Sequence, residues 1–352
     1  MAGSIFQNGT FFCGFDGNPS LSLIFTQGVG GGGSSTNTPF GYGLSINPQN
    51  IFFAYDGILF GENISTHYNG CAFMVPGLPG SVSYYHTWVD VTAGVTQLAL
   101  RLNPNGQLQF YLGSGTGTPI GSASSALTIQ PNVYVYLETA VTIGASGTGS
   151  VKCNVNGANV ITATGVTTQS SSNAWVNCFQ FGATTANSPF YDDWYMLDGT
   201  GSAPYNTFLG PIQVRGDVPT ANSVVGGRNA WTPTSPTGVN YSNVANIPAS
   251  STKFNADSNP GDYDMFRYNS LPSNVTNVLA TNEWATLLLD SAGARTVALN
   301  TYSNGTDSIG TSFTPSSTAA LYNKVSLVDP HTSSAWTVSG VNAAEHGVKV
   351  VS

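Results

Sequence analysis

The chain has 352 residues, of which 7% are charged and 41% are hydrophobic, and its formal net charge is −8. Average soluble proteins have about 25% charged residues, so Ser, Thr, Asn and Gly must cover most of the surface. The 16 Tyr, 18 Phe and 6 Trp supply ample apolar area for folding, which excludes intrinsic disorder. The nine Lys and Arg residues are scattered, which excludes a basic surface for nucleic acid.

Secretion and membrane insertion are not expected. The N-terminus lacks a basic segment followed by an apolar one, and no stretch approaches about 18 consecutive apolar residues. The cysteines lie far apart without a CxxC pair, which gives a zinc cage no support. We expect free, mostly buried thiols in preference to disulfides. These thiols belong to Cys13, Cys71, Cys153 and Cys178.

The composition predicts an all-β protein, because Gly, Thr, Val, Tyr and Phe are frequent whereas Glu, Lys and Arg are few. In chain order, segments of the first half alternate with a period of two residues. Residues 95–102 and 107–112 flank the Asn-Pro-Asn-Gly turn at 103–106. They predict a hairpin, since Asn-Gly readily takes the positive φ values of a tight turn.

Further strands follow this hairpin. Residues 133–141 (VYVYLETAV) alternate so that one face is suited to a core, and residues 149–162 predict a second Asn-Gly hairpin. Two more segments, VNCFQFG and FYDDWYMLDG, end the block. This succession resembles the concanavalin A-like, laminin G-type jelly roll of many tailed-phage virion proteins. The resemblance covers residues 1 to about 200, through VTQLALRLNPNGQLQFYLG, VYVYLETAV, KCNVNGANVI and YDDWYMLDGTG.

Pro and Gly recur at short intervals in the chain after Gly201, which predicts a domain junction. We expect a jelly-roll domain at 1–203, a junction at 204–225 and a second β-rich domain at 226–352. Residues 208–215 can still pair with the first sandwich.

The second domain is similar to a C-terminal module that follows the jelly roll in phage structural proteins. The similarity lies in Asp329-Pro330, Trp336-Thr337 and the Gly-Val-Lys-Val at 347–350. We expect at most one short helix, near residues 341–346, that Gly347 stops.

Carboxylate pairs of the kind that cleave glycans are missing from the sequence. Glycoside hydrolases with concanavalin-like folds need two facing carboxyl groups about 5–9 Å apart. The chain has four glutamates, Glu62, Glu138, Glu283 and Glu345, and no two share a predicted strand. Asp192 and Asp193 are adjacent, so we expect one to accept hydrogen bonds from loop amides and the other to meet solvent. No nucleophile elbow, phosphate-binding loop or dinucleotide fingerprint occurs, and we expect no catalytic residue and no cofactor.

Sugar binding stays open, and we expect no metal site, with calcium binding as the alternative. Sugars need an exposed aromatic ring beside hydrogen-bonding groups at loop ends, although the same residues also make protein contacts. The glycan-binding candidates are Tyr42, His67, Tyr68, Asn69, Tyr84 and Tyr85. Calcium needs oxygen ligands in loops, and no EF-hand spacing is present. The calcium candidates are Asp16, Asn18, Asp56 and Asp90.

The resemblance implies a non-enzymatic virion structural protein, assembled in the bacterial host cytoplasm and displayed as a capsid decoration or a tail fibre or tip component. Its expected partners are other virion proteins, further copies of itself, a trimer by analogy, and a host glycan. Two alternatives stay open. One is a glycan-degrading tail enzyme, which a reducing-sugar assay with Glu138→Gln would reveal. The other is a bacterial carbohydrate-binding module outside any virus.

Overall fold

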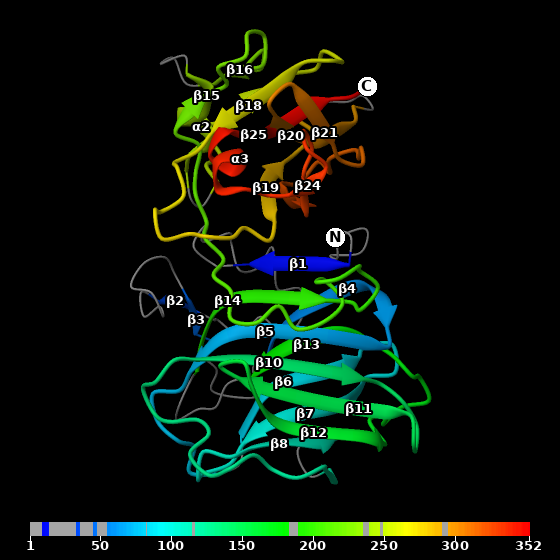
Figure 1. The fold of residues 1–352 in the computed structure, drawn as a ribbon. Helices are drawn as coiled ribbons and strands as arrows, with labels where there is room; N and C mark the ends of the chain where they lie inside the picture. The colour runs from blue at the N-terminus through cyan, green and yellow to red at the C-terminus, as the bar shows by residue number, and fades with distance from the viewer. Residues whose placement is uncertain are drawn as a thin grey trace. The chain divides into compact units, whose positions relative to one another are not determined.

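The protein consists of two compact units of antiparallel strands, Met1–Gly216 and Asp217–Ser352 (Figure 1). The computed structural model describes residues 9–13, 33–35, 45–47, 55–81, 83–114, 117–182, 189–234, 239–246, 249–290 and 295–352. Within these residues, two short helices occur, α2 (Asn240–Val244) and α3 (Val338–Ala343), and no helix is long and apolar enough to cross a bilayer. The all-β class is confirmed, whereas the expected limit of one short helix is wrong.

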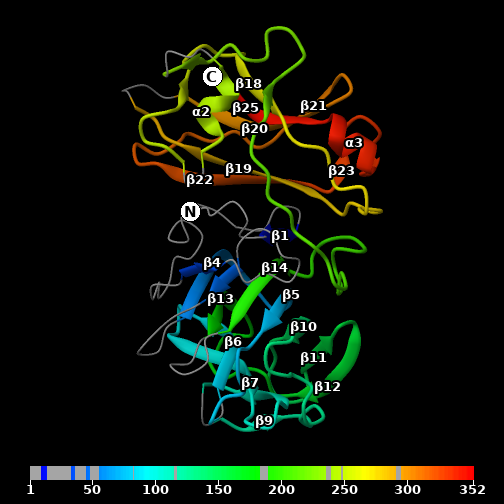
Figure 2. The same cartoon turned by 90° about the vertical axis from the view of Figure 1, so that its left-hand side faces the viewer.

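Unit 1 contains two sheets, which Figure 2 shows as separate layers. Sheet A contains β1 (Thr10–Cys13), β2 (Gly33–Ser35), β3 (Ser45–Asn47), β5 (Thr66–Met74), β10 (Val135–Thr142), β11 (Gly149–Val155), β12 (Ala158–Val166) and β14 (Phe190–Leu197). Sheet B contains β4 (Tyr55–Ile64), β6 (Ser83–Asp90), β7 (Val95–Leu102), β8 (Leu108–Leu112), β9 (Pro119–Ile120) and β13 (Val176–Gly182). The strand orders are β12-β11-β10-β5-β14-β3-β2, with β1 also on β14, and β4-β13-β6-β7-β8-β9.

Aromatic side chains from both sheets meet in the space between them. The Trp194 ring of β14 lies 5.9 Å from Phe179 and 4.7 Å from Phe181, both on β13. The Phe73 ring of β5 lies 5.3 Å from Tyr85 of β6. Alternate strand positions direct these large side chains inward, where they bury most of the apolar area. This is the sandwich that the alternation predicted.

Both predicted Asn-Gly hairpins are confirmed. Strand β7 pairs with β8, and Gly106 in their turn has a φ of 78°. Strand β11 pairs with β12, and Asn156 and Gly157 have φ values of 51° and 78°. The predicted free, buried thiols are also confirmed for Cys13, Cys71, Cys153 and Cys178.

After β14 the chain lies against sheet A without forming a strand. Residues 205–214, which we call the strap, have backbone amides that donate hydrogen bonds to side chains of β10 and β14. Residues 208–215 therefore do contact the first sandwich, but no backbone ladder joins them to it.

Unit 2 is built on one five-stranded sheet and three strand pairs. The sheet contains β15 (Ala221–Asn222), β18 (Tyr263–Arg267), β25 (Glu345–Val350), β20 (Val297–Ser303) and β21 (Thr306–Ile309), in this spatial order. The pairs are β16 (Thr232–Pro233) with β17 (Asn255–Ala256), β19 (Thr281–Leu287) with β22 (Ala320–Ser326), and β23 (Val328–Asp329) with β24 (Ser334–Ala335). Leu299 and Val348 are buried in its core, against which the stacked rings of Phe313 and Tyr322 pack.

The helix expected near 341–346 lies three residues earlier. Helix α3 begins after Thr337, whose Oγ1 accepts a hydrogen bond from the Gly340 amide. Glu345 already starts β25, and Gly347 lies within this strand. Pairing of β25 with both β18 and β20 overrides the local helix-stop signal, as tertiary contacts often do.

A buried carboxylate should make unit 2 more stable in mild acid. Asp264 of β18 is 3% exposed and accepts hydrogen bonds from the side-chain amides of Asn229, Asn240 and Asn255. Burial raises its pKa to about 6, although these hydrogen bonds oppose the shift. The folded pKa exceeds the unfolded value of about 3.9. The stabilisation is therefore complete below about pH 3.9 and is lost as the pH rises through about 6.

Urea denaturation of the wild type and Asp264→Asn checks this expectation. Asp264→Asn should lower the free energy of unfolding by about 2 kcal/mol more near pH 4.5 than near pH 7.5. A difference that stays constant with pH would contradict the assignment.

Candidate functional site

Strand pairing aligns a row of side chains on the outer face of sheet B. Thr87 of β6 lies opposite Ala99 of β7, which lies opposite Tyr111 of β8. Their neighbours Trp88 and Leu100 point into the core between the sheets, so these alternate positions lie on the opposite face of sheet B, where Thr87 and Ala99 are also buried and Tyr111 is half-buried. Ala99, in the middle of the row, has a smaller side chain than Thr87 and Tyr111 on either side.

Arg101 lies at the centre of the next row, two residues further along β7. It is aligned with Tyr84 on β6 and Gln109 on β8. The Arg101 Cζ atom lies 4.7 Å from the centroid of the Tyr84 ring and 3.7 Å from that of Tyr111. The whole residue is only 5% exposed. Arg101 is therefore a buried cation held between two aromatic rings.

The Arg101 guanidinium lacks partners for two of its nitrogens. Nε and Nη2 are buried without a hydrogen-bond partner, and no carboxylate in the described part of the chain pairs with Arg101. Cation–π attraction contributes about 0.5–2 kcal/mol, whereas each buried unpaired donor costs about 1–3 kcal/mol. A carboxylate matches the fork of the guanidinium and would satisfy these donors. The face is therefore suited to an anionic ligand.

Other polar groups on this face also remain available. The hydroxyl groups of the half-buried Tyr84 and Tyr111 make no hydrogen bond with the protein. Gln180 Oε1 accepts a hydrogen bond from Thr87 at 2.9 Å, and the Gln180 amide nitrogen has no partner. Gln109 differs, because its amide nitrogen donates to backbone carbonyls. Hydroxyl and amide groups on the same face as a cation are typical of a site for a polar ligand such as a sugar acid.

Three of the predicted glycan-binding residues lie inside the sandwich. His67, Asn69 and Tyr85 have no exposed area. Trp88 Nε1 donates to His67 Nδ1 at 2.9 Å, and Trp194 Nε1 donates to Asn69 Oδ1 at 2.5 Å. Their assignment to sugar binding is wrong, because strand alternation directs them into the core.

The other glycan-binding candidates lie in different places. Tyr84 belongs to the Arg101 face on sheet B. Tyr68 is on the outer face of sheet A, where its ring lies 5.8 Å from that of Phe208. Tyr42 lies outside the described residues.

The calcium candidate Asp90 is wrong, because the protein itself uses its oxygens. Asp90 is fully buried, Oδ1 accepts the Ala93 amide, and Oδ2 accepts hydrogen bonds from Ser171 and Asn173. Within the described side chains, no group of three His, Cys, Asp or Glu residues could hold a metal ion. The remaining candidates, Asp16, Asn18 and Asp56, have side chains outside that part.

Asp192 and Asp193 are both buried, so the expectation that one meets solvent is wrong. A register shift interrupts the pairing of β14 with β5 at this point, and Asp193 has a φ of 48°. Such a bulge breaks the alternation on which the expectation depended. Asp193 Oδ1 accepts the Val214 amide at 2.7 Å. The glutamates do lie on four different strands, as predicted.

Sequence reasoning missed Arg101, Tyr111 and Gln180. One signal was available, because Arg101 is a single cation inside the otherwise uncharged strand VTQLALRL of a chain with only nine basic residues. Its lack of a counter-charge, however, depends on which strands flank it, and the order β6-β7-β8 emerges only in the folded structure.

No protein-family model and no curated protein matches the chain. Among solved structures, an endo-β-1,4-glucuronan lyase from the fungus Trichoderma reesei is 13% identical with a TM-score of 0.42, covering 58% of this chain and 99% of its own. A cellulose-induced protein is 14% identical with a TM-score of 0.39, covering 53% and 92%. An alginate lyase is 10% identical with a TM-score of 0.36, covering 54% and 96%. At these values the likeness carries no argument about the activity of this chain.

The expectation that the chain is not an enzyme is withdrawn. It relied on the absence of paired carboxylates in the sequence. Missing carboxylate pairs argue only against hydrolysis by two carboxyl groups. They leave open every cleavage reaction that uses other side chains.

Proposed function

We propose that unit 1 binds an acidic polysaccharide on the outer face of sheet B and cleaves it by β-elimination. The observation that carries this proposal is the buried Arg101 guanidinium, which has two unpaired nitrogens between Tyr84 and Tyr111. The carboxylate of a uronate sugar would supply two acceptors in the bidentate geometry that Arg favours. The tyrosine rings would contact the rest of the sugar.

β-Elimination from a uronate fits these residues without a second carboxylate. Arg101 neutralises the sugar carboxylate and so stabilises the negative charge that develops when the C5 proton leaves. Tyr111, whose phenolic proton passes to solvent, takes this proton as the general base. The electrons of the C5–H bond form the C4=C5 double bond, the C4–O4 bond breaks, and Tyr84 donates a proton to the leaving O4. No oxidant or reductant is required.

Arg101→Met and Tyr111→Phe test the two roles separately. The substrates are polyglucuronate, alginate and polygalacturonate, and the ultraviolet absorbance of unsaturated uronate ends measures cleavage. Arg101→Met should lower kcat/KM by about 100-fold or more, because the charge on the carboxylate is no longer neutralised. Tyr111→Phe should lower kcat by about 10²–10⁴-fold and leave binding, measured by calorimetry, nearly unchanged.

Lys152→Met is the matched control, because it removes an exposed cation from the opposite sheet of the same unit. Its kinetics should equal those of the wild type. Polyuronate binding that survives Arg101→Met would contradict the assigned face. Binding without unsaturated products would contradict the cleavage reaction.

The place of the protein in a phage particle rests on the sequence resemblance and stays a prediction. Cryo-electron microscopy or immunogold labelling of purified particles tests it. Failure to find the protein in the particle would contradict it, whatever the outcome of the glycan assays.

A further inference from the structure

The strap, residues 205–214, covers the outer face of sheet A. The amide of Leu209 donates to Tyr195 Oη at 3.1 Å, and that of Gly210 donates to Glu138 Oε1 at 2.9 Å. A third hydrogen bond joins the Val214 amide to Asp193 Oδ1. Side chains of sheet A thus hold the strap in place, and no backbone ladder does so.

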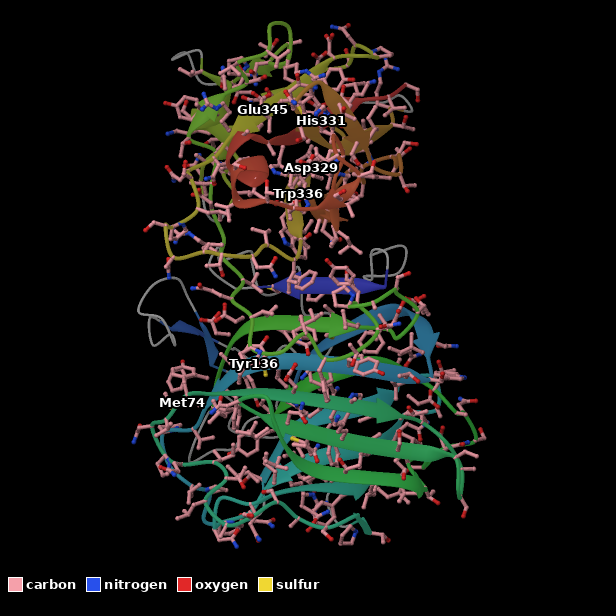
Figure 3. All side chains as sticks on the ribbon, in the orientation of Figure 1. Met74, Tyr136, Asp329, His331, Trp336 and Glu345 are labelled. Carbon is pink, nitrogen blue, oxygen red and sulfur yellow. The ribbon has the colours of Figure 1, made fainter. Side chains whose placement is uncertain are left out.

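Beneath the strap lies a surface of aromatic rings around one carboxylate. The rings of Tyr136 and Tyr195 are stacked with centroids 6.5 Å apart, and Tyr195 Oη donates to Glu138 Oε1 at 2.6 Å. Gly70 of β5 makes room for the Tyr195 ring, which lies only 2.1 Å from where a Cβ atom would be. Figure 3 labels Tyr136 on this side of unit 1. Aromatic rings beside a carboxylate are the groups with which proteins commonly contact sugars.

Phe208 of the strap rests on this surface. Its ring meets that of Tyr68 edge-on at 5.8 Å, and Lys152 Nζ lies 5.4 Å from its centroid. A flat apolar ring therefore occupies a position where the apolar face of a sugar ring could stack.

Glu138 is the part of this surface that the strap leaves incomplete. The residue has no exposed area, and Oε1 receives hydrogen bonds from both Tyr195 and Gly210. Oε2 is buried without any partner. A buried carboxylate oxygen without a donor is unfavourable, and in native proteins it often marks a functional site. Two adjacent hydroxyl groups of a sugar could donate to both carboxylate oxygens of Glu138, whereas the strap donates only to Oε1.

We propose that the outer face of sheet A is a second saccharide-binding face, selective for neutral sugars, and that the strap occupies it in the unliganded protein. Glu138 repels uronates, so this face takes a different class of sugar from the Arg101 face. Because side-chain acceptors and no strand pairing hold residues 205–214, the strap can open locally without unfolding either sheet. Sugar binding and strap displacement are therefore the same event.

The double variant Phe208→Ala/Gly210→Pro releases the strap while every side chain of sheet A stays in place. Proline lacks the N–H group that donates to Glu138 and cannot adopt the φ of 78° at Gly210. Gln213→Ala is the matched control, since Gln213 is an exposed strap residue without a hydrogen bond. The probes are cellohexaose, maltohexaose and mannohexaose, and calorimetry measures their Kd.

The released variant should bind at least one probe about tenfold or more tightly than the wild type, and the control should bind like the wild type. Adding Glu138→Gln to the released variant should raise Kd about tenfold, because a charge-assisted acceptor is lost. Adding Arg101→Met should leave Kd unchanged, which separates this face from the polyuronate face.

Two results would overturn the proposal. One is a released variant whose strap amides exchange rapidly with deuterium but which binds none of the probes. The other is tight binding that Glu138→Gln does not weaken. If the released variant fails to fold, the wild type decides the matter. A saturating probe must accelerate deuterium exchange at the Leu209 and Gly210 amides, and unchanged exchange refutes the proposal.

Discussion

Acidification from about pH 6 to pH 4 is expected to lower the stability of unit 1 strongly. His67 and His86 are fully buried between the two sheets. Burial lowers the pKa of each to about 3, and for His67 the neighbouring His86 adds to the shift. In the unfolded chain both have a pKa of about 6.5. The unfolded state therefore binds more protons, so the stability is complete above about pH 6.5 and is lost progressively as the pH falls toward 3.

The expected loss of unfolding free energy is large enough to decide whether unit 1 stays folded. Each histidine contributes about 3 kcal/mol by pH 4. The sum is comparable with the total stability of about 5–15 kcal/mol of an ordinary domain. Through Asp264, the stability of unit 2 changes with pH in the opposite direction. The two units should therefore unfold in separate transitions when the pH is lowered.

His86→Phe tests the histidine effect. The His86 ring packs against those of Phe179 and Phe181, and its buried Nδ1 has no partner, so a phenyl ring keeps the packing and removes the titration. The difference in unfolding free energy between about pH 7.5 and pH 4 should shrink by about 3 kcal/mol. Urea denaturation followed by tryptophan fluorescence measures it, and packing differences cancel in this comparison. His331→Gln, an exposed change in unit 2, should leave the difference as it is.

Gly347→Ala is expected to unfold unit 2. A Cβ atom on Gly347 would lie 2.0 Å from the backbone oxygen of Asp264 and 2.8 Å from the Cα atom of Met265. Both atoms belong to the backbone of β18, which is paired directly with β25 and cannot move away alone. Such a contact between paired strands should cost more than about 4 kcal/mol, in the exceptional range for a single substitution.

Gly226→Ala provides the control for this substitution. Gly226 is exposed, also lies in unit 2, and has nothing within 4 Å of the position that a Cβ atom would take. Its effect should stay within about 0.5 kcal/mol. Thermal unfolding of both variants measures the contrast. A Gly347→Ala protein with the wild-type Tm would show that β18 can shift to admit a methyl group.

Local chemistry of the sequence determined the hairpins and the sheet faces. The Asn-Gly turns need positive φ values at particular residues, and residues 133–141 alternate, so neighbours in the chain suffice to predict them. Local reasoning failed where distant strands intervene. Gly347 carries the signal of a helix stop, but its role is to let β18 approach. The Asp192–Asp193 pair obeys alternation only until the bulge.

The candidate sites needed more than the sequence. His67 and Asn69 have the chemistry of sugar contacts, yet strand order places both in the core. The sequence by itself determined an all-β chain with few charges, because composition and alternation are local properties. Only the tertiary structure decided that Arg101 lies between two tyrosines without a counter-charge and that the strap leaves one oxygen of Glu138 unpaired. Burial and partners depend on which distant segments meet, and alternation along one strand does not specify that.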